Sequence, residues 1–143
     1  MKSYKFRGWD AVGSKGWVYG DLVHNIKITK EKDLPRVMVG GYEVYPESVG
    51  LFTGLYDGEG KEIYEGDYIQ SDNSFKPVEV IFGHGSFGYL NIWKEFRPLF
   101  DVFFEDSYRL TEVEVVGNKY EENVYPKAGT DDNRPQQGED KRD

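Results

Sequence analysis

The sequence predicts a mainly β fold, in which an N-terminal strand-rich lobe packs on a small SH3-like β-barrel and helix is minor. Aromatic residues make up 16% of the 143 residues, and 17 glycines divide the chain into short segments. This composition favours strands joined by tight turns. The stretch 51–69 shows the pattern best, because two apolar and aromatic runs flank the turn sequence Asp57-Gly58-Glu59-Gly60.

The first predicted hairpin lies at the N-terminus. Residues 4–9 alternate aromatic with basic or small side chains, which is the period of a half-buried strand. A turn sequence follows at 13–16, and residues 17–19 return as the second strand.

A second hairpin is predicted around Gly40-Gly41, between strands at 36–39 and 42–45. The segment before it is ambiguous. Asp21 could cap a short helix, yet residues 21–32 fit neither the helical nor the strand period. Residues 33–35 are expected to form a loop, because the residue before a proline avoids the helical region.

The C-terminal half contains further short strands. After a turn at Glu65-Gly66-Asp67, strands are expected at 68–69, 78–82, 89–93, 99–104 and 113–116. Gly117-Asn118 is expected to turn the chain, so that Tyr120 packs back on the fold.

These elements divide the chain into three parts. We expect an N-terminal β-rich lobe at 1–52 and an SH3-like barrel lobe at 53–123, which share one core because each is small. Residues 124–143 are rich in proline, glycine, glutamine and charge, and they are expected to form a flexible tail.

The composition narrows the classes of function. The formal net charge is −8, which disfavours general binding to nucleic-acid phosphates. Cysteine is absent, which excludes disulfides and thiolate metal sites. The sequence shows no apolar run of membrane-spanning length and no signal peptide, so we expect a soluble cytoplasmic protein without membrane contact.

One candidate site is a basic-aromatic patch formed by Lys5, Arg7 and Trp9, with Phe6 between the cations. Proteins that bind single strands use stacking aromatics beside positive side chains. In a strand, however, Lys5 and Arg7 point away from Phe6, which is then expected to face the core.

The second candidate is the turn that carries Glu62, Glu65, Gly66 and Asp67. Its carboxylates could perform acid–base chemistry if their pKa values were driven apart, or together with His84 they could serve a hydrolase or a metal. Alternatively, Asp67 accepts backbone N–H groups within the turn.

Neither histidine lies in a recognisable motif. His24 and His84 have no paired spacing, and both are expected at the surface. The glycine-rich stretch 83–88 precedes a strand-like run rather than a helix, so it predicts a hairpin turn and not a phosphate-binding loop. No cofactor or metal site is predicted.

Three stretches together resemble the YopX family of small proteins, which are encoded largely by phages and prophages. They are Phe6-Arg7-Gly8-Trp9-Asp10; Thr53-Gly54-Leu55 with Asp57 and the run 60–67; and the run 116–121. The resemblance implies a mostly β fold and no assigned activity, and it brings no catalytic residues.

We therefore expect a phage- or prophage-derived accessory protein that acts as a non-catalytic binding module for an unidentified protein partner. One alternative is an SH3-like module that binds nucleic acid, and the second is a hydrolase or metal enzyme that uses the turn carboxylates. A homo-oligomer, either a dimer or a trimer, is expected through an edge strand or an aromatic face. The aromatic residues considered for that face are Phe96, Phe100, Phe103, Phe104 and Tyr108.

Overall fold

Strands dominate the computed structural model, which describes residues 4–71, 76–102, 105–106, 108–118 and 120–121. Helix in these ranges is limited to the single turn α1 (Leu99–Val102) and the 3-10 turn η1 (Pro46–Ser48). The prediction of a mainly β fold is confirmed. The described strands form one larger sheet and three small ones and close no barrel, so the SH3-like detail stays a prediction.

The largest sheet is built around β1 and β6. Its strands are β1 (Phe6–Trp9), β2 (Trp17–Gly20), β6 (Gly50–Tyr56), β7 (Glu62–Tyr64), β13 (Glu105–Asp106) and β14 (Arg109–Leu110). In it, β1 lies between β2 and β6, and β7 pairs with β6 across the predicted 57–60 turn. The first predicted hairpin is thus present, with Trp9 opposite Trp17.

A second sheet contains β3 (Leu22–Ile28), β4 (Asp33–Val39) and β5 (Tyr42–Val44). The hairpin around Gly40-Gly41 is confirmed, because Val39 pairs with Tyr42. The ambiguous segment after Asp21 forms the strand β3 and no helix. The loop predicted at 33–35 is wrong, because these residues belong to β4 and pair with the end of β3.

Two three-stranded sheets complete the body of the molecule. One has the order β15 (Glu114–Asn118), β8 (Asp67–Gln70), β9 (Val78–Glu79), and the other has the order β10 (Ile81–Gly83), β11 (Ser86–Leu90), β12 (Phe96–Pro98). The glycine-rich stretch forms the β10–β11 hairpin, in which His84 is exposed.

Three predicted segments in this half need correction. The strand expected at 78–82 is interrupted at Val80, and the one expected at 89–93 ends at Leu90. The side chain of Asn91 accepts the N–H groups of Trp93 and Glu95 and closes a turn there. Gly117 and Asn118 do not turn the chain, because both belong to β15 and pair with β8.

The strand predicted at 99–104 is also wrong in its described part. Residues 99–102 form α1, in which Leu99 is fully buried while Phe100 is 58% exposed. The two faces expected for a strand therefore do not exist there, and Phe103 and Phe104 lie outside the described residues. This run gives no support to the expected aromatic contact face.

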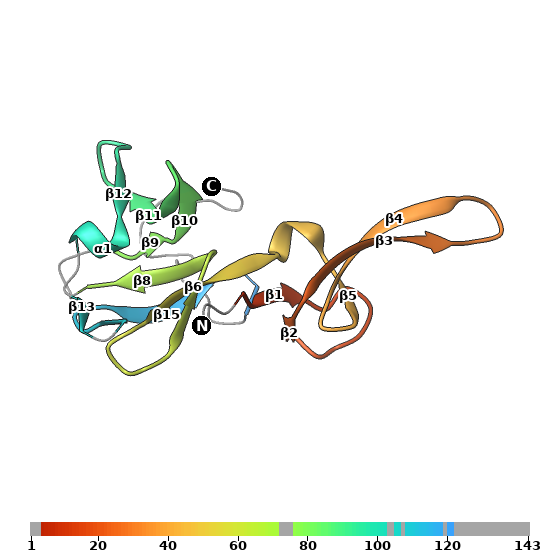
Figure 1. The fold of residues 1–143 in the computed structure, drawn as a ribbon, viewed down its shortest axis with the longest axis horizontal. Coiled ribbons are helices and arrows are strands. Elements are labelled where there is room, and N and C mark those ends of the chain that lie inside the picture. The colour runs from red at the N-terminus through yellow and green to blue at the C-terminus, as the bar shows by residue number, and fades with distance from the viewer. Residues whose placement is uncertain (1–3, 72–75, 103–104, 107, 119, 122–143) are drawn as a thin grey trace, which may run out of the picture.

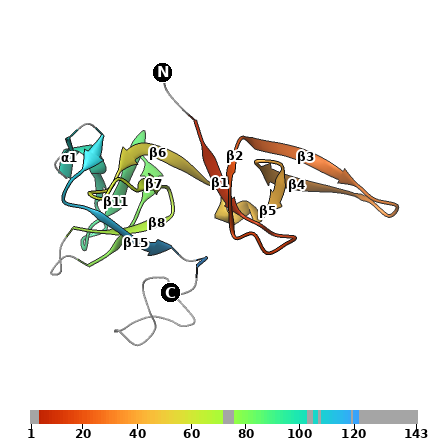
Figure 2. The ribbon, with the colours of Figure 1, turned by 90° about the horizontal axis from the view of Figure 1, so that it is seen from below.

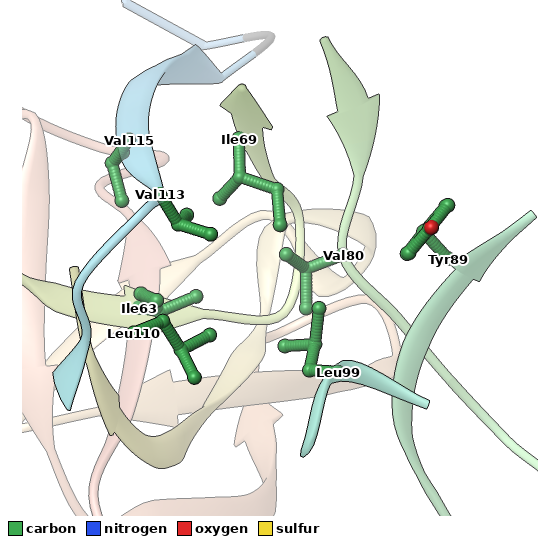
Figure 3. Packing of buried hydrophobic residues seen from close by; sticks show 8 residues of the cluster. All are labelled: Ile63, Ile69, Val80, Tyr89, Leu99, Leu110, Val113 and Val115. Carbon is green, nitrogen blue, oxygen red and sulfur yellow. The ribbon is translucent and has the colours of Figure 1, made fainter. Parts of the chain in front are cut away.

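Two clusters of buried apolar residues hold the fold. The larger one joins side chains from the body: Ile63, Ile69, Val80, Tyr89, Leu99, Leu110, Val113 and Val115 (Figure 3). The smaller one consists of Val18, Val39 and Val44, with Phe6, Leu22, Val37 and Val49 packed against it. The division of the chain at 52 and 53 stays a prediction, and the expected tail at 124–143 lies outside the described residues.

One element projects from this body. Strands β3 and β4 extend along the long axis of the molecule as a two-stranded ribbon, which we call the arm (residues 22–39; Figures 1 and 2). Among the described strands, none pairs with the arm between Val37 and its tip, because β5 pairs only with residues 37–39 of β4.

Candidate functional site

The two candidate sites of the sequence come together in space. Arg7 on β1 reaches the turn before β8, where its Nη2 atom lies 2.7 Å from Oδ1 of Asp67. Both side chains are buried, with exposed fractions of 6% and 2%. The second carboxylate oxygen of Asp67 accepts the N–H of Tyr64 at 2.8 Å. Asp67 therefore holds both a cation and a backbone amide of its own turn.

The buried guanidinium also lies between aromatic rings. Its central carbon is 4.0 Å from the ring centre of Trp17 and 4.8 Å from that of Tyr64. Such cation–π contacts are strongest where water is excluded. Burial raises the pKa of the Asp67 carboxyl above its ordinary value, while Arg7 and the amide of Tyr64 act in the opposite direction.

A second ion pair lies beside the first. The Nζ atom of Lys5 is 2.7 Å from Oε2 of Glu62, and the other oxygen of Glu62 accepts the hydroxyl of Tyr64 at 2.8 Å. Burial, followed by this hydrogen bond, raises the pKa of the Tyr64 hydroxyl. Lys5 and Arg7 thus each face a carboxylate of the candidate turn; the side chain of Arg7 is buried, while that of Lys5 is 38% exposed.

The remaining members of the turn line a small pocket of about 90 Å³. Glu65 and Gly66 contribute to it together with Arg7, Trp17 and Tyr120. Gly66 has a φ of 98°, a left-handed conformation that favours glycine. Within the described part of the chain, the Nε atom of Arg7 and the Nε1 atom of Trp17 are buried without a hydrogen-bond partner.

Aromatic rings close one side of this cluster. Trp9 and Trp17 meet edge to face at 5.1 Å, and the ring of Tyr120 stacks on Trp9 at 6.0 Å. Tyr120 therefore packs back on the fold, as the sequence predicted. The sequence analysis did not recognise Trp17 and Tyr64 as members of this site. A signal for Trp17 was present, because the predicted hairpin places it directly opposite Trp9.

The histidines do not join the cluster. His84 lies in the β10–β11 turn, where its ring contacts Phe96, and His24 is exposed on the arm. Among the described residues, no three histidine, aspartate or glutamate side chains are placed to hold a metal ion.

A further carboxylate fixes the central turn. Asp57 is buried, and its Oδ1 atom accepts the N–H groups of Glu59 and Lys61 while Oδ2 accepts that of Val115. It thereby ties the 57–60 turn to β15. The sequence indicated the turn but not this long-range bond.

The arm exposes several large apolar side chains, among them Val23, Ile26, Ile28 and Leu34. Residues directly opposite each other in an antiparallel pair share a face, and the register places His24, Ile26, Ile28, Pro35 and Val37 together with Leu22, Asp33 and Val39 on one side. We call this side the apolar arm face. It begins in the smaller core at Val39 and runs outward to Ile28, which is 80% exposed.

A shallow hollow of about 320 Å³ lies at the base of this face. Its apolar lining comes from Ile26, Pro35 and Val37 on the arm and from Pro46 beside it. The arm is held to the body by a close approach at Gly40, where an added Cβ would collide with the carbonyl oxygen of Tyr19. Only glycine fits there, which fixes where the ribbon leaves the body.

The fold and the site together define a small, mainly β protein with a buried ion pair, Arg7–Asp67, and buried carboxylates at Asp10 and Asp57 that accept backbone N–H groups. A family model described as YopX protein matches residues 5–124, and the chain therefore belongs to the YopX family. The resemblance seen in the sequence is confirmed.

Among solved structures, the chain is similar to one titled crystal structure of protein EF1440 from Enterococcus faecalis. The two share 23% sequence identity and a TM-score of 0.46, over 84% of this chain and 95% of that chain. No curated protein matches the sequence. No helix among the described residues has the length and apolar character needed to cross a membrane.

Proposed function

We propose that this chain is a non-catalytic binding module, derived from a phage or prophage, which acts in the cytoplasm on a protein partner. One observation carries the proposal: the arm presents an apolar face to solvent, with Ile26 57% and Ile28 80% exposed. Exposed apolar surface of this kind is characteristic of contact with another protein. The phage origin rests on the YopX family.

The state of the turn carboxylates supports a binding role over catalysis. A general acid or base needs an oxygen that is open to substrate. One oxygen of Asp67 pairs with Arg7, and the other accepts the N–H of Tyr64. Glu62 pairs with Lys5 and accepts the hydroxyl of Tyr64. A hydrolase or metal enzyme would therefore have to rely on Glu65, because Asp67 and Glu62 are already engaged.

Affinity capture from lysogenic cells tests the binding role. The wild-type chain and an Ile26→Asp/Ile28→Asp variant are used as baits, with Leu34→Asp as the matched control on the opposite side of the arm. All three positions are exposed, so the substitutions are expected to change stability by only about 0.5 kcal/mol. A specific partner should be lost with the first variant and kept with the control. Equal capture by all three baits would contradict a binding role for the apolar arm face.

A nucleic-acid-binding module with an SH3-like body is the second candidate function. One observation favours it: the arm carries Lys27, Lys30, Lys32 and Arg36 against two acidic residues. Fluorescence anisotropy with single-stranded DNA and RNA at low salt tests it. Binding that weakens steeply with salt and is lost with Lys30→Glu/Lys32→Glu would support this function, and an absence of binding at low salt would exclude it.

A further inference from the structure

We propose that the partner of the apolar arm face is a second copy of this chain, and that two arms pack face to face and antiparallel about a two-fold axis. This inference rests on the proposed binding role of the arm and specifies the partner. It follows from the shape of the face, from its polarity and from the distribution of charge along the molecule.

The apolar arm face carries a projection and a depression that match each other. Ile28 stands out near the tip, while the hollow lies toward the base; its apolar lining is Ile26, Pro35, Val37 and Pro46, and its polar lining is His24, Asn25 and Arg36. In an antiparallel pair, Ile28 of each copy enters the hollow of the other. A surface that bears both halves of a contact is self-complementary, as a two-fold interface requires.

The face is also apolar enough to gain from being covered. Ile26, Ile28 and Pro35 are all exposed, and they continue the smaller core outward from Val37 and Val39, with His24 and Asp33 as the polar residues of this face. Each exposed aliphatic side chain that becomes buried contributes favourably to association. The opposite side of the ribbon carries Asn25, Lys27 and Arg36 beside Val23, Leu34 and Met38, and is less suited to burial.

The charge distribution selects the antiparallel orientation. Residues 22–39 contain four basic and two acidic side chains, a net charge of +2, whereas the whole chain has −8, which leaves −10 on the remainder. An antiparallel pair brings the basic tip of each arm, with Lys30 and Lys32, toward the acidic body of the other copy. Glu47 follows directly after Pro46 of the hollow and is exposed, although it also lines the small pocket beside Arg7 and Trp17. A parallel pair would instead set tip against tip and cation against cation.

The arms are short, so the interface between them is small, and the dimer should have micromolar rather than nanomolar affinity.

Sedimentation velocity of the purified full chain near physiological salt, from low to high micromolar concentration, tests whether the dimer forms. The wild type should shift from monomer to dimer with concentration. Ile28→Asp should weaken dimerisation at least about tenfold, because it removes the aliphatic side chain that fills the hollow and buries a carboxylate in its place. Leu34→Asp, on the other face, should behave as the wild type.

A charge exchange tests the orientation separately. Lys30→Glu/Lys32→Glu and Glu47→Lys should each weaken the dimer, and the two sets combined in one chain should restore much of the affinity. Circular dichroism of every variant checks that the fold is retained. Restoration by the combination is a result that damage to the fold cannot produce.

Several results would overturn the inference. A chain that stays monomeric up to high micromolar concentration would do so, as would a trimer, or equal weakening by Ile28→Asp and Leu34→Asp. A monomer that captures another protein or a nucleic acid through the arm would overturn the second copy as partner. Capture of a different protein through the arm would still support the proposed binding-module function. The dimer inference and the proposed function can therefore fail separately.

Discussion

Removing the Asp67 carboxylate is the sharpest test of how the molecule is held together. In Asp67→Ala, the guanidinium of Arg7 stays buried without its partner at 2.7 Å, and the N–H of Tyr64 loses its acceptor. Breaking a buried ion pair from one side costs about 3–5 kcal/mol. An unpaired buried N–H costs about 1–3 kcal/mol, part of which water entering the vacated space recovers. We therefore expect the free energy of unfolding to fall by about 4 kcal/mol.

A loss of that size approaches the whole stability of a small protein, about 5–15 kcal/mol, so a milder variant is needed beside it. Asp67→Asn keeps an acceptor for the amide of Tyr64 and removes mainly the charge, with an expected loss of about 3 kcal/mol. Arg7→Met removes the cation, which takes away the interaction that lowers the pKa of Asp67. A carboxyl whose folded pKa is raised is stabilised by protonation, so Arg7→Met should gain stability as the pH falls through that pKa.

The double variant Arg7→Met/Asp67→Asn completes the cycle. Replacing both partners leaves no buried charge, so its loss should be smaller than the sum of the single losses by about 1–3 kcal/mol. Urea unfolding followed by tryptophan fluorescence measures the wild type, Asp67→Ala and the three variants of the cycle, because the Trp17 ring lies 4.0 Å from the Arg7 guanidinium. A loss below about 1 kcal/mol for Asp67→Ala, or single losses that add within about 0.5 kcal/mol, would refute the reasoning.

Three further predictions concern other buried or strained positions of the fold. Gly66→Ala should cost about 1 kcal/mol in thermal unfolding followed by circular dichroism, because the φ of 98° disfavours a side chain; an unchanged melting temperature would contradict this. Asp10 accepts three backbone N–H groups, led by those of Gly13 and Val12, which lower the pKa of its carboxyl below the ordinary value of 3.8. Its contribution to stability is therefore present above that value and is lost as the pH falls through the lowered pKa; a carboxyl resonance that titrates above 3.8 by NMR would disprove it. Tyr120→Ala should cost about 1–2 kcal/mol and change the tryptophan emission, because the ring stacks on Trp9; an emission spectrum identical to that of the wild type would argue against the stack.

Local signals predicted the hairpins correctly because each depends on neighbouring residues alone. Gly40-Gly41 supplies the backbone freedom of a two-residue turn, and the strands at 36–39 and 42–45 follow from it. The alternation at residues 4–9 was also right, since Phe6 packs against the smaller core while Arg7 points to the other side. The alternation does not show that the side of the strand that carries Arg7 is buried as well, beneath Trp17 and Tyr64.

The errors arose where tertiary context overrides a local rule. Pro35 was read as a loop residue, yet it lies in β4 where only β3 pairs with the strand. Its missing N–H costs no ladder hydrogen bond on the unpaired edge, which is where a strand tolerates proline. At 99–102 the strand-like composition gave way to a single helical turn that buries Leu99 in the larger core.

The candidate site was predictable in its parts but not in its assembly. Arg7 and Asp67 are 60 positions apart, and no local pattern pairs them. Their two segments nevertheless belong to the stretches that carry the YopX resemblance, and the third stretch supplies Tyr120, which stacks on Trp9. The three stretches therefore meet in one cluster of buried charge and aromatic rings, which gives each of them a role in packing. The arm, residues 22–39, lies outside all three, which separates the part of the chain that defines the fold from the part that we propose makes the contact.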